Sequence, residues 1–241
     1  MKLLAFLLFG AFTLNLSGQV SHKQWDQLVK KHVSEIGNVN YKGIIQDKEH
    51  LTSYLTLLSN NPPKSSWTKD ETLAYWINAY NAFTVQLIIK HYPVESIKDL
   101  GGSIYKVNTS WDIKFIKIGY EELDLNNIEH QKIRGQFKEP RIHFAVNCAS
   151  VSCPRLRFEA YTAEKLDAQL TDQTKYFLSF KIKNDLSDPS QPKLSKLFSW
   201  YSGDFKLEGQ TVIDFINKYA SVKIPENANV DYLDYNWNLN E

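Results

Sequence analysis

The segment TKDETLAYWINAYNAFTVQLI, residues 68–88, decides the fold that the sequence predicts. Thr68 followed by Glu71 forms a capping box, which is typical of the first turn of a helix. Core-facing positions then recur at helical spacing, at Leu73, Trp76, Ile77, Tyr80, Thr84, Leu87 and Ile88. The opposite side of this helix is hardly polar, so we expect it to lie at the centre of the molecule.

The composition is that of a globular protein. The chain has 241 residues, of which 43% are hydrophobic and 13% aromatic, and its formal net charge is +1. This excludes disordered, collagen-like and coiled-coil proteins, and it provides no overall attraction for nucleic acid. We expect one mainly helical α+β domain over residues 19–241 with a small β-sheet, in which residues 19–60 form a helical lead-in.

The first 18 residues resemble an export signal. Lys2 is followed by an almost wholly apolar run from Leu3 to Leu14, and then by polar or small residues up to Gly18. This is the pattern of a secretory signal peptide, and the apolar run is too short to span a bilayer comfortably. We therefore expect cleavage near Gly18 and an exported, soluble mature protein, periplasmic or extracellular, with no membrane span.

Other elements follow from local spacing. We expect helices capped by Ser21 and ended by Gly37, over residues 49–59, from Asp124 or Asn126 to near Gly135, and over residues 162–180, 194–201 and 211–219. Strands are expected within residues 104–118 and over residues 142–148. The aromatic tail, residues 230–239, is expected to dock on the body.

Two asparagines lie at the margin of the central helix's apolar stripe. Asn78 and Asn81 are three residues apart and therefore point to one side. Their amides need hydrogen-bond partners there. They either bind the backbone of a neighbouring loop or orient a catalytic group or substrate.

Glu129 falls on the buried face of the short helix, and His130 flanks it. A buried carboxylate must be paired, protonated or in use. Its structural partner would be Arg134 or Arg141; alternatively, it acts as an acid or base or orients a histidine. In the expected strand, His143 and Asn147 share the face opposite to Phe144.

The two cysteines of the chain, Cys148 and Cys153, are separated by four residues. In an exported protein, such a pair is compatible with a disulfide. The competing interpretation is a reactive thiol: Pro154 suits the first turn of a helix, whose positive end would lower the thiol pKa, and His143 or His130 would be the base.

Several long motifs resemble the family called domain of unknown function five-four-seven. The motifs are Tyr75–Ala82 (YWINAYNA), Ile128–His130 (IEH), Arg141–Ser150 (RIHFAVNCAS) and Ser152–Pro154 (SCP), with later agreement at residues 161–164, 197–205 and 232–240. The resemblance implies no established activity. The same residue types are also similar, distantly at most, to those of papain-like thiol hydrolases, in which the cysteine precedes its histidine.

Two functions remain open at this point. The first is a thiol-dependent hydrolase or transferase with Cys148 as nucleophile, His143 or His130 as base and Glu129 as orienting group. Oxyanion donors would come from three amides, those of Asn78, Asn81 and Asn147. The ligand would be a small molecule or peptide, and the residues indicate no cofactor.

The alternative is a binding or scaffolding module without catalysis. Aromatic residues including Trp200, Tyr201, Tyr235 and Trp237 would form its groove for a peptide, a glycan or another exported protein. Its cluster of Glu, His and Asn side chains would be structural, and Cys148 and Cys153 would form a disulfide. A weaker interpretation is a metal site made of Glu129, His130 and His143. The spacing of adjacent Glu and His on a helix disfavours chelation, so we expect no metal.

Overall fold

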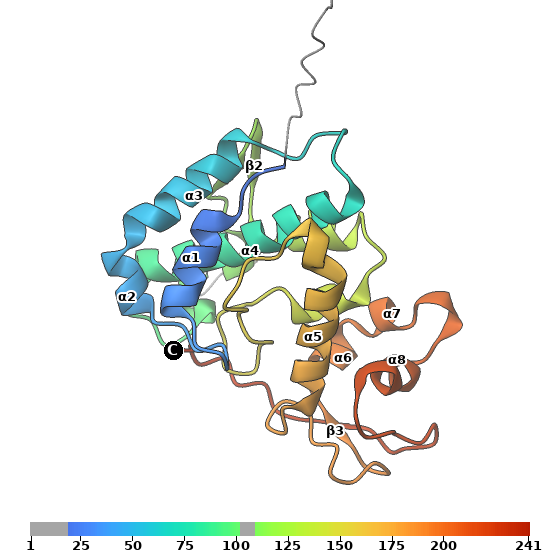
Figure 1. The fold of residues 1–241 in the computed structure, drawn as a ribbon. Coiled ribbons are helices and arrows are strands. Elements are labelled where there is room, and N and C mark those ends of the chain that lie inside the picture. Colours follow the sequence, from blue (N-terminus) through green and yellow to red (C-terminus); the bar gives the residue numbers. More distant parts are fainter. Residues whose placement is uncertain (1–18, 102–108) are drawn as a thin grey trace, which may run out of the picture.

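The computed structural model describes residues 19–101 and 109–241, and α4 (Lys69–His91) runs through its middle (Figure 1). The predicted capping box is present, because Thr68 accepts a hydrogen bond from the Glu71 backbone N–H while the Glu71 carboxylate accepts one from the Thr68 N–H. Every side chain from Leu73 to Val85 is buried. The prediction of a central helix is confirmed.

Three helices cover one side of α4: α1 (Lys23–His32), α2 (Tyr41–Gln46) and α3 (Lys48–Asn60). Helix α1 ends earlier than predicted, because the backbone becomes extended at Val33 and pairs there with Val39. Its N-cap is His22 rather than Ser21. Asn40 caps α2, a helix that was not predicted, by accepting from the Gly43 N–H.

Two short helices and a hairpin follow α4. They are η1 (Ile97–Leu100), η2 (Ser110–Asp112), β1 (Ile116–Ile118) and β2 (Glu121–Leu123). The two strands are antiparallel, with Ile116 opposite Leu123, and Gly119 takes a positive φ of 60° in their turn. The strand predicted around residues 104–107 lies outside the described residues.

The strand predicted over residues 142–148 is wrong. Residues Pro140–Phe144 form a 3₁₀ turn, η4, and the chain then continues as a loop. Pro140 lies in the first turn, and the Glu139 carboxylate accepts a hydrogen bond from the Arg141 N–H. Pro and a capping acid both favour a helical start, and this local preference outweighs the alternation of apolar residues.

The C-terminal half builds a second core. Its elements are η5 (Ala163–Lys165), α5 (Leu166–Ser179), α6 (Leu197–Trp200), α7 (Ser202–Phe205), η6 (Leu207–Gly209), α8 (Val212–Tyr219) and the parallel pair β3 (Lys193–Leu194) and β4 (Asp231–Tyr232). Phe144 is packed among the rings of this core, whereas Ala145 belongs to the larger core around α4. The two cores therefore meet at η4.

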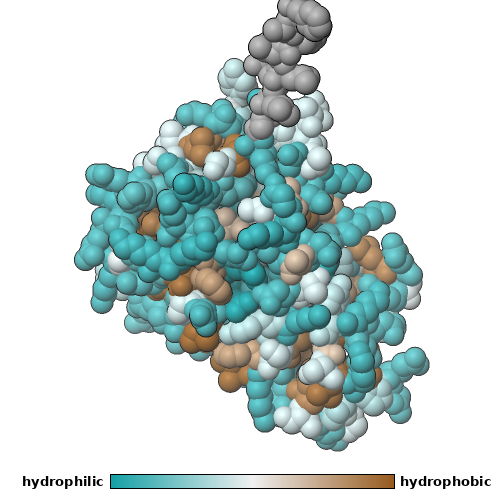
Figure 2. All heavy atoms as spheres, in the orientation of Figure 1, coloured by the Kyte–Doolittle hydropathy of each residue, from teal (hydrophilic) through white to brown (hydrophobic). Residues whose placement is uncertain are grey.

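The fold is mainly helical, and the described residues form two two-stranded sheets, in line with the predicted α+β class. The face seen in Figure 2 is largely hydrophilic, with hydrophobic residues in small separate groups. Within residues 19–101 and 109–241, none of the helices combines the length and apolar character that crossing a membrane requires.

Candidate functional site

A cleft of about 190 Å³ lies where the two halves of the molecule meet. Three of the predicted site residues, Glu129, His130 and Cys148, line it together. The remaining wall is largely aromatic and consists of Tyr80, Trp111, Asn126, Leu197, Trp200, Tyr201, Tyr235 and Trp237. Segments distant in the sequence thus converge on one hollow.

Glu129 and His130 are placed by η3 (Asn127–Arg134), a π-helix. The Asp124 carboxylate accepts a 2.6 Å hydrogen bond from the Asn127 N–H and fixes the start of this element. Ile133 is buried beneath it, which orients η3 toward α4. Wide π-turns recur at functional sites because they re-aim neighbouring side chains.

The Glu129 carboxylate is 5% exposed and accepts a 2.7 Å hydrogen bond from the Tyr201 hydroxyl. The structural ion pairs considered for it are not formed. Arg134 binds Asp204 through two nitrogens, at 2.6 and 3.0 Å, and Arg141 binds Glu139 instead. Within the described part of the chain, no cation pairs with Glu129.

His130 is exposed at the rim, and its Nδ1 lies 2.8 Å from a guanidinium nitrogen of Arg134. A guanidinium only donates hydrogen bonds, so Nδ1 must accept and the proton of the neutral ring must reside on Nε2. The structure therefore favours His130 as a hydrogen-bond donor toward the cleft. The sequence had assigned it the role of a base.

His143 lies beneath the cleft wall, with its ring stacked on that of Tyr201 at 4.0 Å between centroids. Its Nε2 is 2.7 Å from an Asp204 carboxylate oxygen. Burial lowers the pKa of His143, while hydrogen bonds from His143 and Arg134 hold the pKa of Asp204 well below its usual range. None of its hydrogen bonds reaches Cys148, and its ring packs instead against the Tyr201 ring of the cleft wall.

Cys148 lies in a tight loop that follows η4. The next residue, Ala149, takes a positive φ of 59°, which is uncommon for a side chain other than glycine. The Asn147 side chain stabilises this turn by accepting a 2.9 Å hydrogen bond from the Ala149 N–H. Strained backbone of this kind concentrates at functional sites.

The Cys148 sulfur has polar neighbours on three sides. Cys153 Sγ is 2.7 Å away, and the hydroxyls of Ser150 and Tyr235 are each 3.3 Å away. Burial alone would raise the pKa of Cys148, but its hydrogen-bond contacts with these three groups lower it below that of an ordinary thiol. Burial and the neighbouring Cys148 sulfur raise the pKa of Cys153.

The sequence predicted that the N-terminus of a helix after Pro154 would lower the thiol pKa, and this prediction is wrong. Residues 154–157 form no helix, so no helix N-terminus acts on the thiol. In the structure, the contacts of the Cys148 sulfur with Cys153, Ser150 and Tyr235 lower the thiol pKa, and neither a helix N-terminus nor an imidazole does so. The two cysteines are unbridged in the structure.

The three asparagines bind backbone rather than the cleft. Asn78 exchanges two hydrogen bonds with the Tyr161 backbone, and Asn81 donates to the Ala145 carbonyl while accepting from the Asn147 N–H. Asn147 also donates to the Pro154 carbonyl. The hydrogen bonds that these amides form hold the loops, and none of the three asparagines lines the cleft, so the structure gives no support to their assignment as oxyanion donors.

The sequence did not place the aromatic residues of the cleft beside Cys148. It predicted a groove of Trp200, Tyr201, Tyr235 and Trp237 only for the non-catalytic alternative, and it missed Trp111 and Asn126. Tyr201 follows α6, and Tyr235 and Trp237 come from the tail, far from Cys148 in the chain. The aromatic clustering at residues 197–201 and 232–237 was the available signal. It did not indicate which ring would meet which loop, because that depends on how the two cores pack.

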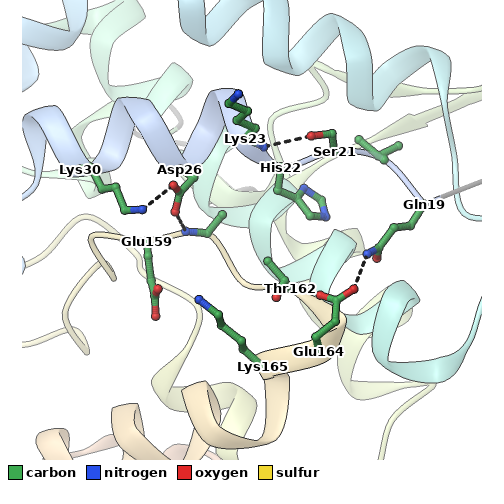
Figure 3. A pocket seen from close by; sticks show the side chains of 12 residues that line it. Gln19, Ser21, His22, Lys23, Asp26, Lys30, Glu159, Thr162, Glu164 and Lys165 are labelled. Atoms are coloured by element: carbon green, nitrogen blue, oxygen red, sulfur yellow. Dashed lines mark hydrogen bonds and ion pairs between the residues drawn. The ribbon is translucent and has the colours of Figure 1, made fainter.

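A larger hollow of about 480 Å³ lies beside α1 and η5 (Figure 3). Lys30 pairs there with Asp26 at 2.7 Å, and the Glu164 carboxylate accepts a hydrogen bond from the uncharged Gln19 amide at 3.2 Å. Neither cysteine lines this hollow. Across residues 19–101 and 109–241, no three His, Cys, Asp or Glu side chains are grouped to hold a metal ion.

Residues 64–178 match the family model described as protein of unknown function, DUF547. This part of the chain is similar to that family. Among curated proteins and solved structures, no match accompanies it. The DUF547 region contains α4, η3 and the Cys148 loop, but α6 and the tail lie beyond it. The Cys148 side of the cleft is thus within the matched residues, and most of the aromatic wall is outside them.

Proposed function

We propose that the cleft is the active site of a thiol-dependent hydrolase or transferase in which Cys148 is the nucleophile. One observation carries the proposal: Cys148 lines an open cleft, while polar contacts with Cys153, Ser150 and Tyr235 lower the pKa of its thiol. The thiolate, rather than the thiol, is the reactive species. Such stabilisation has no structural purpose in a merely buried cysteine.

The proposed reaction is an acyl transfer. The Cys148 thiolate forms a bond to the acyl carbon, and the leaving group departs with a proton from solvent. Water in a hydrolase, or an acceptor nucleophile in a transferase, then attacks the thioester and releases the thiolate.

His130 is suited to assist at the oxyanion. Its Nε2–H is available because Arg134 occupies Nδ1, and a fixed donor aimed at developing charge lowers the barrier. Asp204 holds Arg134, and His143 holds Asp204. We assign Asp204 and His143 a positioning role.

The test is alkylation of the folded protein by iodoacetamide over a range of pH, with the modified residue located by mass spectrometry. Wild-type protein is expected to be modified at Cys148, with a midpoint below that of an ordinary thiol. Cys148→Ala is expected to lose the fast reaction. The matched control, Cys153→Ala, retains Cys148 and is expected to be alkylated there.

Two results would overturn the proposal. A Cys148 that resists alkylation in the folded, reduced protein would show that the thiol is not accessible. A protein isolated with a stable Cys148–Cys153 disulfide that resists reducing agents would support the alternative, a binding or scaffolding module.

We also propose that the protein is exported, on the strength of the leader-like residues 1–18. These residues lie outside the described part of the chain. N-terminal sequencing of the mature protein tests the proposal: a first residue near Gln19 supports export, and an intact Met1 contradicts it.

A further inference from the structure

The cleft contains a buried carboxylate whose charge is not balanced by a cation of the described chain. Glu129 is 5% exposed, and the hydrogen bond that it receives comes from an uncharged group, the Tyr201 hydroxyl. Removing a carboxylate from water without a counter-ion is costly. Arg134, the cation nearest along the helix, is already bound to Asp204.

Aromatic rings surround the opening above this carboxylate. Tyr235 and Trp237 lie 4.5 Å apart between centroids, and Trp200 lies 4.9 Å from Tyr235 and 5.9 Å from Trp237. Trp111 meets Trp237 edge to face at 5.7 Å. Rings at these separations pack against one another and form one aromatic surface, in which the ring faces, unlike the edges, carry negative charge density.

At the rim of the cleft, a cation of the protein already contacts one of these rings. The Lys98 ammonium lies over Trp237 at 5.1 Å from its centroid. Lys98 is exposed, and among the described residues it forms no ion pair. A cation therefore occupies an aromatic face at the edge of the cleft, whereas the carboxylate lies deeper.

We propose that the cleft binds a small organic cation, an alkylammonium or quaternary ammonium group, with Glu129 as its counter-ion and Trp200, Trp237 and Tyr235 as its aromatic cage. This inference deepens the proposed function, because it rests on the same cleft and names the cationic group that a substrate would carry. Aromatic cages recognise quaternary ammonium groups through cation–π attraction.

The size of the cleft fits a head group rather than a large ligand. Its volume of about 190 Å³ lies below the roughly 300–1,000 Å³ of sites for drug-sized ligands. The cation would sit between Glu129 and the rings, which leaves Cys148 in the same wall to meet the acyl part of the molecule. A cationic ester or amide has this combination of groups.

The experiment measures binding of choline and of 3,3-dimethylbutan-1-ol by tryptophan fluorescence and calorimetry. The two molecules have the same shape, but only choline carries a charge. Measuring in the Cys148→Ala protein separates binding from any reaction. Choline is expected to bind roughly tenfold or more tightly than the neutral alcohol.

Two variants locate the site. Glu129→Gln is expected to weaken choline binding roughly tenfold, whereas Glu122→Gln removes the same charge from an exposed position of β2 and is expected to change nothing. Trp200→Leu is expected to weaken choline binding as well. Trp200 is 48% exposed, so this change should leave the fold intact, which circular dichroism would verify.

Equal affinity for choline and the neutral alcohol would overturn the inference, as would equal effects of the two glutamate variants. Tighter binding of a neutral sugar such as N-acetylglucosamine would also overturn it and would indicate a carbohydrate platform. If no cation binds while Cys148 is still alkylated at low pH, the cation site fails and the proposed nucleophile stands. If choline binds but Cys148 is inert, the reverse holds.

Discussion

Two hollows of the molecule differ in size and in chemistry. The hollow beside α1 has a volume of about 480 Å³, and its Lys30 and Asp26 side chains pair with each other. The aromatic cleft is less than half as large, and it holds a thiol whose pKa is lowered and a buried carboxylate that no described cation pairs with. The thiol is what separates the two hollows, because a nucleophile with a shifted pKa in a cleft is a candidate for function.

The comparison also separates two kinds of polar burial. Asn78 and Asn81 are as buried as any core residue, and their hydrogen bonds go to backbone groups. Glu129 is nearly as buried, yet its hydrogen bond comes from the Tyr201 hydroxyl and no described cation pairs with it. Holding the backbone accounts for the burial of the two asparagines, whereas no such structural role accounts for the buried carboxylate.

The largest expected effect concerns the frame that holds the cleft. Asn81→Ala removes the amide that binds both the Ala145 carbonyl and the Asn147 N–H. Leaving buried polar groups unpaired costs about 1–3 kcal/mol each, so the free energy of unfolding should fall by roughly 2–5 kcal/mol. Urea denaturation measures the change.

The matched control is Asn61→Ala. Asn61 is partly exposed and donates one hydrogen bond to the Leu57 carbonyl in its own helix. We expect a loss below about 1 kcal/mol there. Equal losses in the two variants would show that the amide at residue 81 does not organise the Cys148 loop.

The second prediction concerns the larger hollow. Burial lowers the pKa of His22 to about 4. Because the unfolded chain binds this proton near pH 6.5 and the folded protein only near pH 4, stability should fall as pH drops through this window, by up to roughly 3 kcal/mol. Above pH 6.5 both states are neutral, and this contribution stays constant.

Urea unfolding at pH 7.5 and at pH 5 checks this prediction. His22→Gln should lose stability less steeply than wild type between the two values. An identical slope in the two proteins would mean that His22 is not held neutral by the fold. The same comparison with His50→Gln, an exposed histidine of α3, serves as the control.

The third prediction sharpens the chemistry of the cleft. Cys153→Ala removes the thiol that lies 2.7 Å from the Cys148 sulfur and lowers its pKa. The midpoint of Cys148 alkylation should therefore move to higher pH, and the rate at neutral pH should fall severalfold. An unchanged profile would assign the activation to Ser150 and Tyr235 alone.

The smallest effect is expected for the paired charges of the larger hollow. Lys30 binds Asp26 at the surface of α1, where side chains are solvated. Lys30→Met should change the free energy of unfolding by about 0.5 kcal/mol or less. A loss above about 2 kcal/mol, measured in urea, would contradict the view that these pairs are incidental.

The sequence predicted the elements that depend on local signals. The capping box of Thr68 and the spacing after it define α4, and the position of Glu129 on the buried face of a short helix is confirmed. The strand over residues 142–148 failed because a strand needs a partner, and no neighbouring segment of the described chain supplies one. Alternation of apolar residues does not reveal that lack.

The meeting of Glu129, His130 and Cys148 was expected from their chemistry, but their roles were not. Arg134 fixes the tautomer of His130, and Asp204, 70 residues further on, fixes Arg134. Such a chain of contacts depends on how α7 packs against η3. It is a property of the tertiary structure that residue types and spacing do not encode locally.

The tail that supplies Tyr235 and Trp237 is tied to the Cys148 loop, since the Asn238 and Asn236 carbonyls accept hydrogen bonds from the Val151 and Ser152 N–H groups. This segment follows both cores along the chain, so the ribosome makes it after the residues that build them. A nascent chain, or one cut by a protease ahead of the tail, would keep most of its two cores but lack a finished site. The Cys148 thiol would thus lack its contact with the Tyr235 hydroxyl until the tail has been synthesised and has packed on the loop.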